Sequence, residues 1–337
     1  MKKLCKIAAI MLSVSMMLVG CSSKQETNGT AENGEKKFKV ALLLSGPAND
    51  QGWNATALEG LNQAESEHGV ETAYMENVQI ADAEAAYTDY AAQGYDLIIG
   101  HGFQFGEPAA RVAAKFPDIS FMATESNSQA DNMASYIMSC EQGAYIMGIL
   151  SASMSKSGKI GVVGGIEQPS IVKELEAFKI AAKEVNPNIE VFEIYVNSFT
   201  DVNLGKEAAM SMISNGADVL YHVANQAGTG VIKAAEENKV LVCGNSYDQS
   251  SISPDYLMAS TIYNMPKVIV TAVDQLKKGE FKGGVFNLGM ADGVVEISGY
   301  NTFEDKIPED VKQKIEDTKK AIIDGSLSVP VIEKPTK

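Results

Sequence analysis

The residues best suited to chemistry lie in a loop that follows the first apolar strand of the sequence. Residues 45–54 contain Asn49, Asp50 and Asn54, whose side chains offer hydrogen-bond donors and acceptors, and Trp53, the only tryptophan of the chain. An indole has a flat apolar face and one N–H donor, so a tryptophan in a loop is suited to stacking on a planar ring. The structural alternative is that an Asn or Asp caps the next helix and Trp53 packs in the core.

A second aromatic residue, Phe199, has a similar setting further along the chain. Residues 197–201 follow a predicted strand and precede a predicted helix. If the two loops face each other, Trp53 and Phe199 could hold a planar ring between them, and stacking of a base on an aromatic side chain contributes roughly 1–3 kcal/mol. Taken alone, Phe199 fits a core residue better. Together with Trp53, the two interpretations are balanced.

Other polar features show no catalytic pattern. His101 lies in the turn after a predicted strand, but no acidic residue at a diagnostic spacing marks it as a catalytic base. His222 lies within an apolar strand and is interpreted as a core histidine. Residues 161–165 lack the glycine spacing of a dinucleotide site, and neither a Walker loop nor a nucleophile elbow occurs. We therefore expect no enzyme, no cofactor and, because the histidines lack ligand spacing, no metal.

Strands and helices alternate from residue 39 onward, in two series separated by a polar break at residues 155–158. The first series has predicted strands over 40–44, 71–75, 97–99, 120–123 and 135–138, and helices over 54–68, 82–93, 106–116 and 142–153. The second has strands over 159–163, 189–195, 219–223 and 240–243, and helices over 171–185, 205–214 and 229–237. This alternation predicts an α/β protein with two lobes, each a mostly parallel sheet flanked by helices.

Ligands of open α/β sheets bind outside the carboxyl ends of the strands, so two lobes that face each other there would enclose a cleft. The residues that we expect at this cleft share a position just after a predicted strand. They are Ser45, Asn49, Asp50, Trp53, Asn54, His101, Phe103, Glu125, Phe199, Ala224, Gly228, Ser246 and Asp248.

The N-terminal residues are typical of a sorting signal. A basic start is followed by an apolar run over residues 7–19, which is too short to span a bilayer, since that takes about 20 apolar residues. Residues 18–21 resemble the lipobox of bacterial lipoproteins, which ends in an acylated cysteine. We predict a signal peptide over 1–20, a lipid anchor at Cys21 on the outer face of the cell membrane and a polar tether over 21–37. The alternative is a secreted protein with an incidental cysteine.

The composition of the chain restricts the class of binding partner. A net charge of −15 argues against a nucleic-acid partner, since phosphate binding needs clustered Lys and Arg.

Cys140 and Cys243 lie far apart in sequence, so we expect two buried free thiols instead of a disulfide. The first predicted lobe comprises residues 38–154 and a segment within 264–284. The second comprises residues 158–262 and 285–337.

The mature sequence resembles the basic membrane protein family, lipoprotein substrate-binding components of ABC importers with a type I periplasmic-binding fold. The motifs that carry the resemblance are ordered along the chain: 164–166 with Pro169, 178–179, 185–187, 198–201, 205–207, 216–219, 228–231, 247–249, 279–284 and 288–289. The resemblance implies a monomer that binds a purine nucleoside and docks on an ABC permease with its ATPase. It places Trp53 and Phe199 on the two faces of the base and Asn54 at its edge.

Three departures from the family pattern concern the ligand. Ser45 stands where an acidic residue is usual, Ser246 where an aspartate is usual, and Tyr263 where a lysine is usual. The resemblance assigns the last two positions to the ribose hydroxyls, so a ribose is held differently here or is absent. Residues 46–53 are also similar to a branch that takes free purine bases.

The leading hypothesis is therefore an importer subunit that closes its cleft on a purine nucleoside or base. The alternatives are a membrane-tethered small-molecule sensor, an importer subunit for another solute such as a sugar or a peptide-like compound, and an enzyme such as a nucleosidase.

Overall fold

The computed structural model describes residues 37–50 and 52–336. The chain divides into two units, residues 1–36 and 37–337, and the description below concerns the second. The predicted signal peptide, the lipidation site at Cys21 and the predicted tether up to residue 36 lie outside the described residues. Within the described ranges, no helix is both long and apolar enough to cross a membrane.

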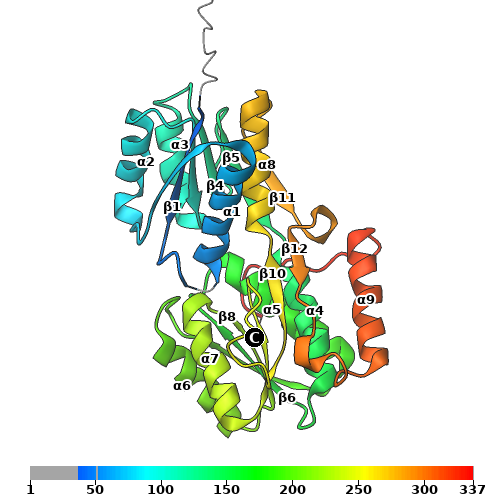
Figure 1. The fold of residues 1–337 in the computed structure, drawn as a ribbon. Helices are drawn as coiled ribbons and strands as arrows, with labels where there is room; N and C mark the ends of the chain where they lie inside the picture. Colours follow the sequence, from blue (N-terminus) through cyan, green and yellow to red (C-terminus); the bar gives the residue numbers. More distant parts are fainter. Residues whose placement is uncertain (1–36, 51, 337) are drawn as a thin grey trace, which may run out of the picture. The chain divides into compact units, whose positions relative to one another are not determined.

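The first sheet has six strands in the order β11-β5-β4-β3-β1-β2, and every pairing in it is parallel. Its strands are β1 (Lys39–Leu44), β2 (Glu71–Met75), β3 (Leu97–His101), β4 (Ser120–Thr124), β5 (Met133–Met138) and β11 (Gly284–Leu288). We call this sheet and its helices the first lobe (Figure 1).

Helices cover both faces of this sheet. They are α1 (Trp53–His68), α2 (Ala83–Ala92), α3 (Gly106–Ala113) and α8 (Met265–Lys278), with short 3-10 turns η1 (Ile80–Asp82) and η2 (Phe103–Phe105). Alternate residues of a strand point to opposite faces, so Val40, Leu42 and Leu44 pack with α1 and α8, whereas Ala41 and Leu43 pack with α2 and α3. Helices α1 and α8 lie side by side (Figure 1).

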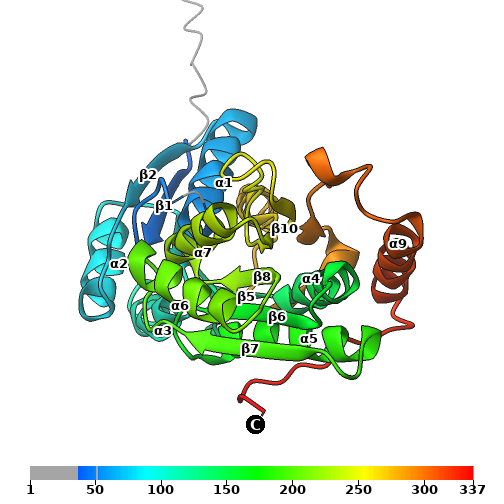
Figure 2. The same cartoon turned by 90° about the horizontal axis from the view of Figure 1, so that it is seen from below.

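The second sheet has six strands in the order β12-β10-β9-β8-β6-β7, and only β12 is antiparallel to its neighbour. Its strands are β6 (Lys159–Gly164), β7 (Glu190–Tyr195), β8 (Val219–Val223), β9 (Leu241–Gly244), β10 (Leu257–Tyr263) and β12 (Val295–Ile297). Its helices are α4 (Cys140–Met154), α5 (Pro169–Val185), α6 (Val202–Ser214), α7 (Asn225–Asn238) and α9 (Glu309–Ile323), with 3-10 turns η3 (Met290–Asp292) and η4 (Asn301–Phe303). Helices α6 and α7 pack together (Figure 2), as do α4 and α5. We call this assembly the second lobe.

Local sequence explains where several helices begin and end. Asp201 caps α6 by accepting from the backbone N–H groups of Asn203 and Leu204. Helix α5 begins at Pro169, whose ring fixes a helical φ and whose missing N–H would have no partner there. Helix α8 ends at Gly279, which has a φ of 70° that a side chain would strain.

The predicted α/β architecture with two lobes is confirmed, and Cys140 and Cys243 are buried free thiols as predicted. Two boundaries differ from the prediction. Strand β11 pairs with β5, so residues 285–288 belong to the first sheet and not to the C-terminal segment of the second lobe. Helix α4 packs on α5, so residues 140–154 belong with the second lobe. Helical and strand periodicity shows which face an element buries, but not which lobe it packs against.

Candidate ligand-binding cleft

Two loops at strand ends, one from each lobe, meet in direct hydrogen bonds. The first follows β1 and opens α1, and the second follows β8 and opens α7. Asn225, the first residue of α7, accepts from the Trp53 N–H at 3.1 Å and donates to Asp50 Oδ2 at 3.0 Å. The carboxyl ends of the two sheets are therefore in contact where a ligand of this fold class binds.

Asp50 fixes the first loop. Its side chain is buried, and its Oδ1 accepts from the backbone N–H groups of Gly52 and Ala55, both at 3.0 Å. Its Oδ2 accepts from the backbone N–H of Asn54 at 2.9 Å and from Asn54 Nδ2 at 2.7 Å. These bonds satisfy N–H groups at the start of α1 that have no partner within the helix. Asp50 thus holds the first turn of α1, whose N-cap position is occupied by Gly52.

Trp53 lies on an imidazole. Its ring stacks on His101 with the centroids 4.0 Å apart, and it meets Tyr263 edge-on at 6.5 Å. His101 Nε2 is 2.9 Å from the Trp53 carbonyl oxygen, and Nδ1 is 3.2 Å from Thr124 Oγ1. Burial lowers the pKa of His101 to about 4, although the Trp53 carbonyl and Asp50 act in the opposite direction. The ring is thus neutral near pH 7. Because a carbonyl can only accept, Nε2 carries the proton.

Asn54 keeps hydrogen-bonding capacity in this setting. It is buried, one N–H of its amide donates to Asp50, and its Oδ1 is 3.5 Å from Ser45 Oγ. One N–H and one oxygen lone pair remain for another partner. A free donor and a free acceptor on one amide match the paired acceptor and donor on the edge of an adenine.

In the second lobe, Phe199 lies directly on a glycine at the end of β6. A Cβ placed on Gly165 would come within 2.3 Å of Phe199 Cε1, so any side chain there would displace the ring. Phe199 is half-buried. Within the described residues, Phe199 makes no ring contact with Trp53, so the two predicted aromatic faces are not brought together directly.

A buried polar network lies at the ends of β9 and β10. Asn245 Nδ2 is 2.9 Å from the hydroxyl oxygens of Tyr221 and Tyr263, and Ser246 Oγ donates to Asn245 Oδ1 at 2.7 Å. The Tyr263 hydroxyl donates to Glu174 Oε2. Burial raises the pKa of Glu174 to about 8, against the lowering effect of the bond from Tyr263. Ser246 and Tyr263 are thus held by partners within the protein.

A second contact between the lobes involves charged groups. Glu125, predicted at the cleft, accepts from the Met138 N–H at 2.7 Å and lies 3.5 Å from Lys173 Nζ. Lys173, on α5, also donates to the Met138 carbonyl oxygen at 2.6 Å and lies 3.5 Å from Glu141. Burial disfavours the charged form of Lys173, but the carboxylates, Glu125 foremost, hold its pKa above the ordinary value. Glu125 has a φ of 54°, a strained conformation for a residue with a side chain.

The remaining predicted site residues fall into two groups. Asn49, Phe103 and Asp248 are exposed, and Asp248 accepts from the Ser250 N–H at 3.0 Å within its own turn. Ala224 and Gly228 are buried, and a Cβ on Gly228 would lie 2.0 Å from His222 Nδ1. These five make none of the contacts between the lobes described above.

His222 is buried as predicted for a core histidine. Its Nε2 pairs with Gln249 Oε1 at 2.9 Å, whereas its Nδ1 has no hydrogen-bond partner. Burial lowers the pKa of His222 to about 4. The described residues contain no group of three or more His, Cys, Asp or Glu side chains arranged to hold a metal ion.

Sequence reasoning missed Asn225, Asn245, Lys173 and Glu174. The first two could have been found, because each lies within two residues of the end of a predicted strand, next to a residue that was named. The predicted helix begins at residue 229, so Asn225 fell within the loop 224–228, from which only Ala224 and Gly228 were named. Lys173 and Glu174 have no such signal, since each is an ordinary charged residue in a helical pattern.

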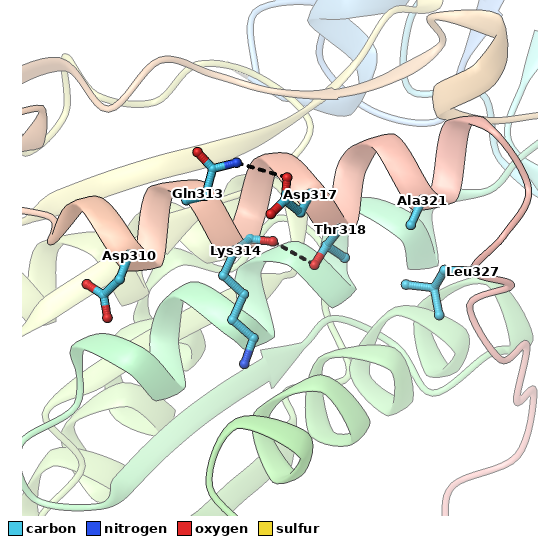
Figure 3. Close-up of a pocket in the computed structure, with 7 residues that line it drawn as sticks. All are labelled: Asp310, Gln313, Lys314, Asp317, Thr318, Ala321 and Leu327. Atoms are coloured by element: carbon cyan, nitrogen blue, oxygen red, sulfur yellow. Dashed lines mark hydrogen bonds between the residues drawn. The ribbon is translucent and has the colours of Figure 1, made fainter.

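A groove elsewhere on the surface is a weaker candidate for a ligand-binding site. It has a volume of about 660 Å³ and runs along α9, lined by Asp310, Gln313, Lys314, Asp317, Thr318, Ala321 and Leu327 (Figure 3). Gln313 donates to Asp317 at 2.9 Å and Thr318 donates to the Lys314 carbonyl oxygen at 2.8 Å, both within the helix. The groove is open to solvent and does not lie at strand ends, so the candidate site is the contact between the lobes.

Two α/β lobes that meet at the carboxyl ends of their strands form the fold of two-lobed solute-binding proteins. This chain belongs to the Bmp family, described as ABC transporter substrate-binding proteins similar to PnrA, whose signature matches residues 37–333. Members of this class bind small ligands outside the cytoplasm and interact with the permease components of ABC transporters.

Two relatives and one solved structure show how far the similarity reaches. A purine-binding protein of Brucella abortus is 30% identical over 89% of this chain and 85% of its own length. The ABC transporter nucleoside-binding protein BmpA of Lactococcus lactis is 28% identical over 98% of this chain and 99% of its own. The solved structure of an ABC transporter solute-binding protein from Aeropyrum pernix has a TM-score of 0.81 at 23% identity, and covers 88% of this chain and 94% of that one. It shows the shared fold.

Proposed function

We propose that this protein captures a purine, as the free base or the nucleoside, between its lobes and delivers it to an ABC permease. The observation that carries the proposal is the pair formed by Trp53 and Asn54 at the start of α1. The stack on His101 fixes the plane of the indole, and the Asp50 bond fixes the Asn54 amide beside it. A flat apolar face next to a free amide donor and acceptor suits a planar heterocycle with polar edges. Two relatives with purine-binding and nucleoside-binding names support the same ligand class.

The state of the two predicted ribose positions favours the free base. The Tyr263 hydroxyl pairs with Glu174 and Asn245, and the Ser246 hydroxyl pairs with Asn245. A ribose would have to break these buried bonds, each of which leaves an unsatisfied group when it is broken. We therefore expect the base to bind more tightly than its nucleoside.

Calorimetry tests the ligand class. Purified protein is titrated with adenine, guanine, hypoxanthine and their nucleosides, and quenching of Trp53 fluorescence provides a second readout. We expect saturable binding of at least one purine, and weaker binding of its nucleoside. Absence of heat and of quenching with every purine at about 1 mM, a concentration that detects dissociation constants up to about 1 mM (a binding free energy of about −4 kcal/mol), would refute the purine assignment.

The proposal includes a lipid anchor at Cys21, which keeps the protein near its permease. Replacing this cysteine, Cys21→Ser, should move the protein from the membrane fraction to the soluble fraction and leave purine affinity unchanged. Retention of the variant in the membrane fraction would contradict the anchor.

Uptake of a labelled purine by cells that express the protein tests delivery. Uptake should fall when the gene is deleted and return with the intact gene. Unchanged uptake together with demonstrated purine binding would contradict the importer role and point to a sensor.

A further inference from the structure

The first turn of α1 is completed by a residue of the other lobe. The first N–H groups of a helix have no partner within it. In α1, the N–H groups of Asn54 and Ala55 bond to Asp50, which belongs to the same loop. The N–H of Trp53 bonds instead to Asn225, at the start of α7 in the second lobe.

The Asn225 amide uses both of its polar atoms in this contact. Its Oδ1 accepts from the Trp53 N–H at 3.1 Å, and its Nδ2 donates to Asp50 Oδ2 at 3.0 Å. Asn225 has a φ of 49°, in the left-handed region that asparagine tolerates better than most residues. The approach also requires a glycine opposite, because a Cβ on Gly52 would lie 2.6 Å from Asn225 Oδ1.

The chemistry of the contact specifies an amide. One partner is an N–H donor and the other is a carboxylate acceptor, so the bridging side chain must accept at one atom and donate at the other. An aspartate in place of Asn225 could accept from Trp53, but its second oxygen would face the Asp50 carboxylate. An alanine would offer neither group.

When the lobes separate, the ligand-facing loop loses its hydrogen bonds to Asn225 as well as the edge contact of Trp53 with Tyr263. The Asp50 bonds to Gly52, Asn54 and Ala55 all lie within the first lobe and can persist in an open form. Among the described residues of this loop, only the hydrogen bonds to Asn225 cross to the second lobe. Asn225 Oδ1 accepts from the Trp53 backbone N–H, and Asn225 Nδ2 donates to the Asp50 carboxylate that orients Asn54.

We propose that Asn225 is a positioning residue that couples closure of the lobes to the placement of Trp53 and Asn54. Closure of the lobes completes the cap of α1 and adds one hydrogen bond to the Trp53 backbone and one to the Asp50 carboxylate that holds Asn54, which restricts both residues further. The coupling acts on the protein alone, so it holds whichever small molecule the cleft takes.

Hydrogen exchange without ligand tests the coupling directly. The full chain is compared with Asn225→Asp and Asn225→Ala by mass spectrometry of peptides that cover residues 52–56. We expect exchange there to be about tenfold faster in Asn225→Asp, because of repulsion from Asp50, and to rise less in Asn225→Ala; tenfold corresponds to about 1.4 kcal/mol. Peptides from β1 and from β8 should exchange as in the wild type.

Asn188→Asp is the matched control, because it makes the same chemical change at an exposed position before β7, at the opposite end of that sheet's strands. It should leave exchange of residues 52–56 unchanged. Equal exchange of residues 52–56 in the wild type and in both Asn225 variants would overturn the coupling. If Asn225→Asp fails to fold, the comparison of Asn225→Ala with the wild type decides between the two outcomes.

A second arm uses a ligand, with adenine as the probe. Both Asn225 variants should release adenine faster than the wild type, with little change in the association rate, because the closed state is the one that loses its contact. Wild-type rates in both variants would count against the proposal. If adenine does not bind the wild type, the purine assignment fails, and the exchange experiment still tests Asn225.

Discussion

Two of the contacts between the lobes have opposite chemistry. At Asn225 a neutral amide bridges Trp53 and Asp50 from a half-buried position. At Lys173 an ammonium group with 6% of its side chain exposed lies among Glu125, Glu141 and the Met138 carbonyl oxygen.

This difference indicates which contact can break. A buried charge that loses its partner remains uncompensated in a medium of low polarity, which is costly, whereas an amide and its partners can exchange their bonds for water at small net cost. The Lys173 contact also lies at Met138, where the chain leaves β5 to enter α4 and passes from one lobe to the other. We infer that the Lys173 cluster holds the crossover while the Asn225 contact opens and closes.

The largest expected effect comes from removing the buried ammonium group. Lys173→Met leaves Glu125 and Glu141 without their cation, and should lower the free energy of unfolding by about 3–5 kcal/mol in urea titrations. Lys206→Met serves as the comparison, because Lys206 forms an exposed pair with Glu237, and its loss should change stability by less than about 1 kcal/mol. Equal effects of the two substitutions would show that burial of the Lys173 cluster is unimportant.

The next largest effect is the pH dependence of stability that arises from Glu174, the residue after Lys173. Its pKa is raised by burial to about 8 in the folded protein from an ordinary value of 4.5, so between these values the folded state holds a proton that the unfolded state has lost. The stability from this group is present in full below pH 4.5 and is lost as the pH rises through 8. His101 and His222, with folded pKa values of about 4 and an ordinary value of 6.5, act mainly below pH 6.5.

Between pH 6.5 and 8 the free energy of unfolding should therefore fall as the pH rises, and Glu174→Gln should flatten this slope. Urea titrations at several pH values provide the measurement. A slope that persists in Glu174→Gln would assign the titration to another group.

A smaller effect is expected at the glycine that faces Asn225. Gly52→Ala places a Cβ 2.6 Å from Asn225 Oδ1 and should push the amide away from Trp53. Ligand affinity should fall by about tenfold, which corresponds to about 1.4 kcal/mol, while thermal stability changes little. A large loss of stability with normal affinity would reverse the roles that we assign to the two contacts.

The smallest effect is the stability change of Asn225→Ala. Two hydrogen bonds to a half-buried side chain are exchanged for bonds to water, so we expect a loss of about 1 kcal/mol or less in urea titrations. A loss comparable to that of Lys173→Met would mean that the contact does not open readily.

The sequence was sufficient for the fold and for much of the first loop. Alternating strand and helix patterns predicted the α/β class and most strands of both sheets, but not β10, β11 and β12. The turn-rich run before α1 singled out Asp50, Trp53 and Asn54, which the structure brings together. The role of Asp50 as a cap was one of two interpretations, and only the contacts could decide between them.

The partners of these residues depend on the tertiary structure. Asn225 lies 172 residues after Trp53, and Lys173 lies 48 residues after Glu125. A local sequence pattern carries no information about contacts between residues so far apart in the chain. The assignments of β11 and α4 to a lobe likewise depend on how the chain crosses between the sheets, which periodicity does not encode.

The measurement that tests the central claim most directly is a calorimetric titration of the wild type and of Trp53→Ala with adenine. The indole face beside Asn54 is the feature on which the ligand assignment rests, and stacking of a base contributes roughly 1–3 kcal/mol. We predict saturable binding by the wild type and affinity that is weaker by about tenfold to a hundredfold in Trp53→Ala, measured on variant protein that still unfolds cooperatively, because Trp53 also packs on His101 and on the core. Equal affinity in the two proteins would contradict the placement of the ligand at Trp53.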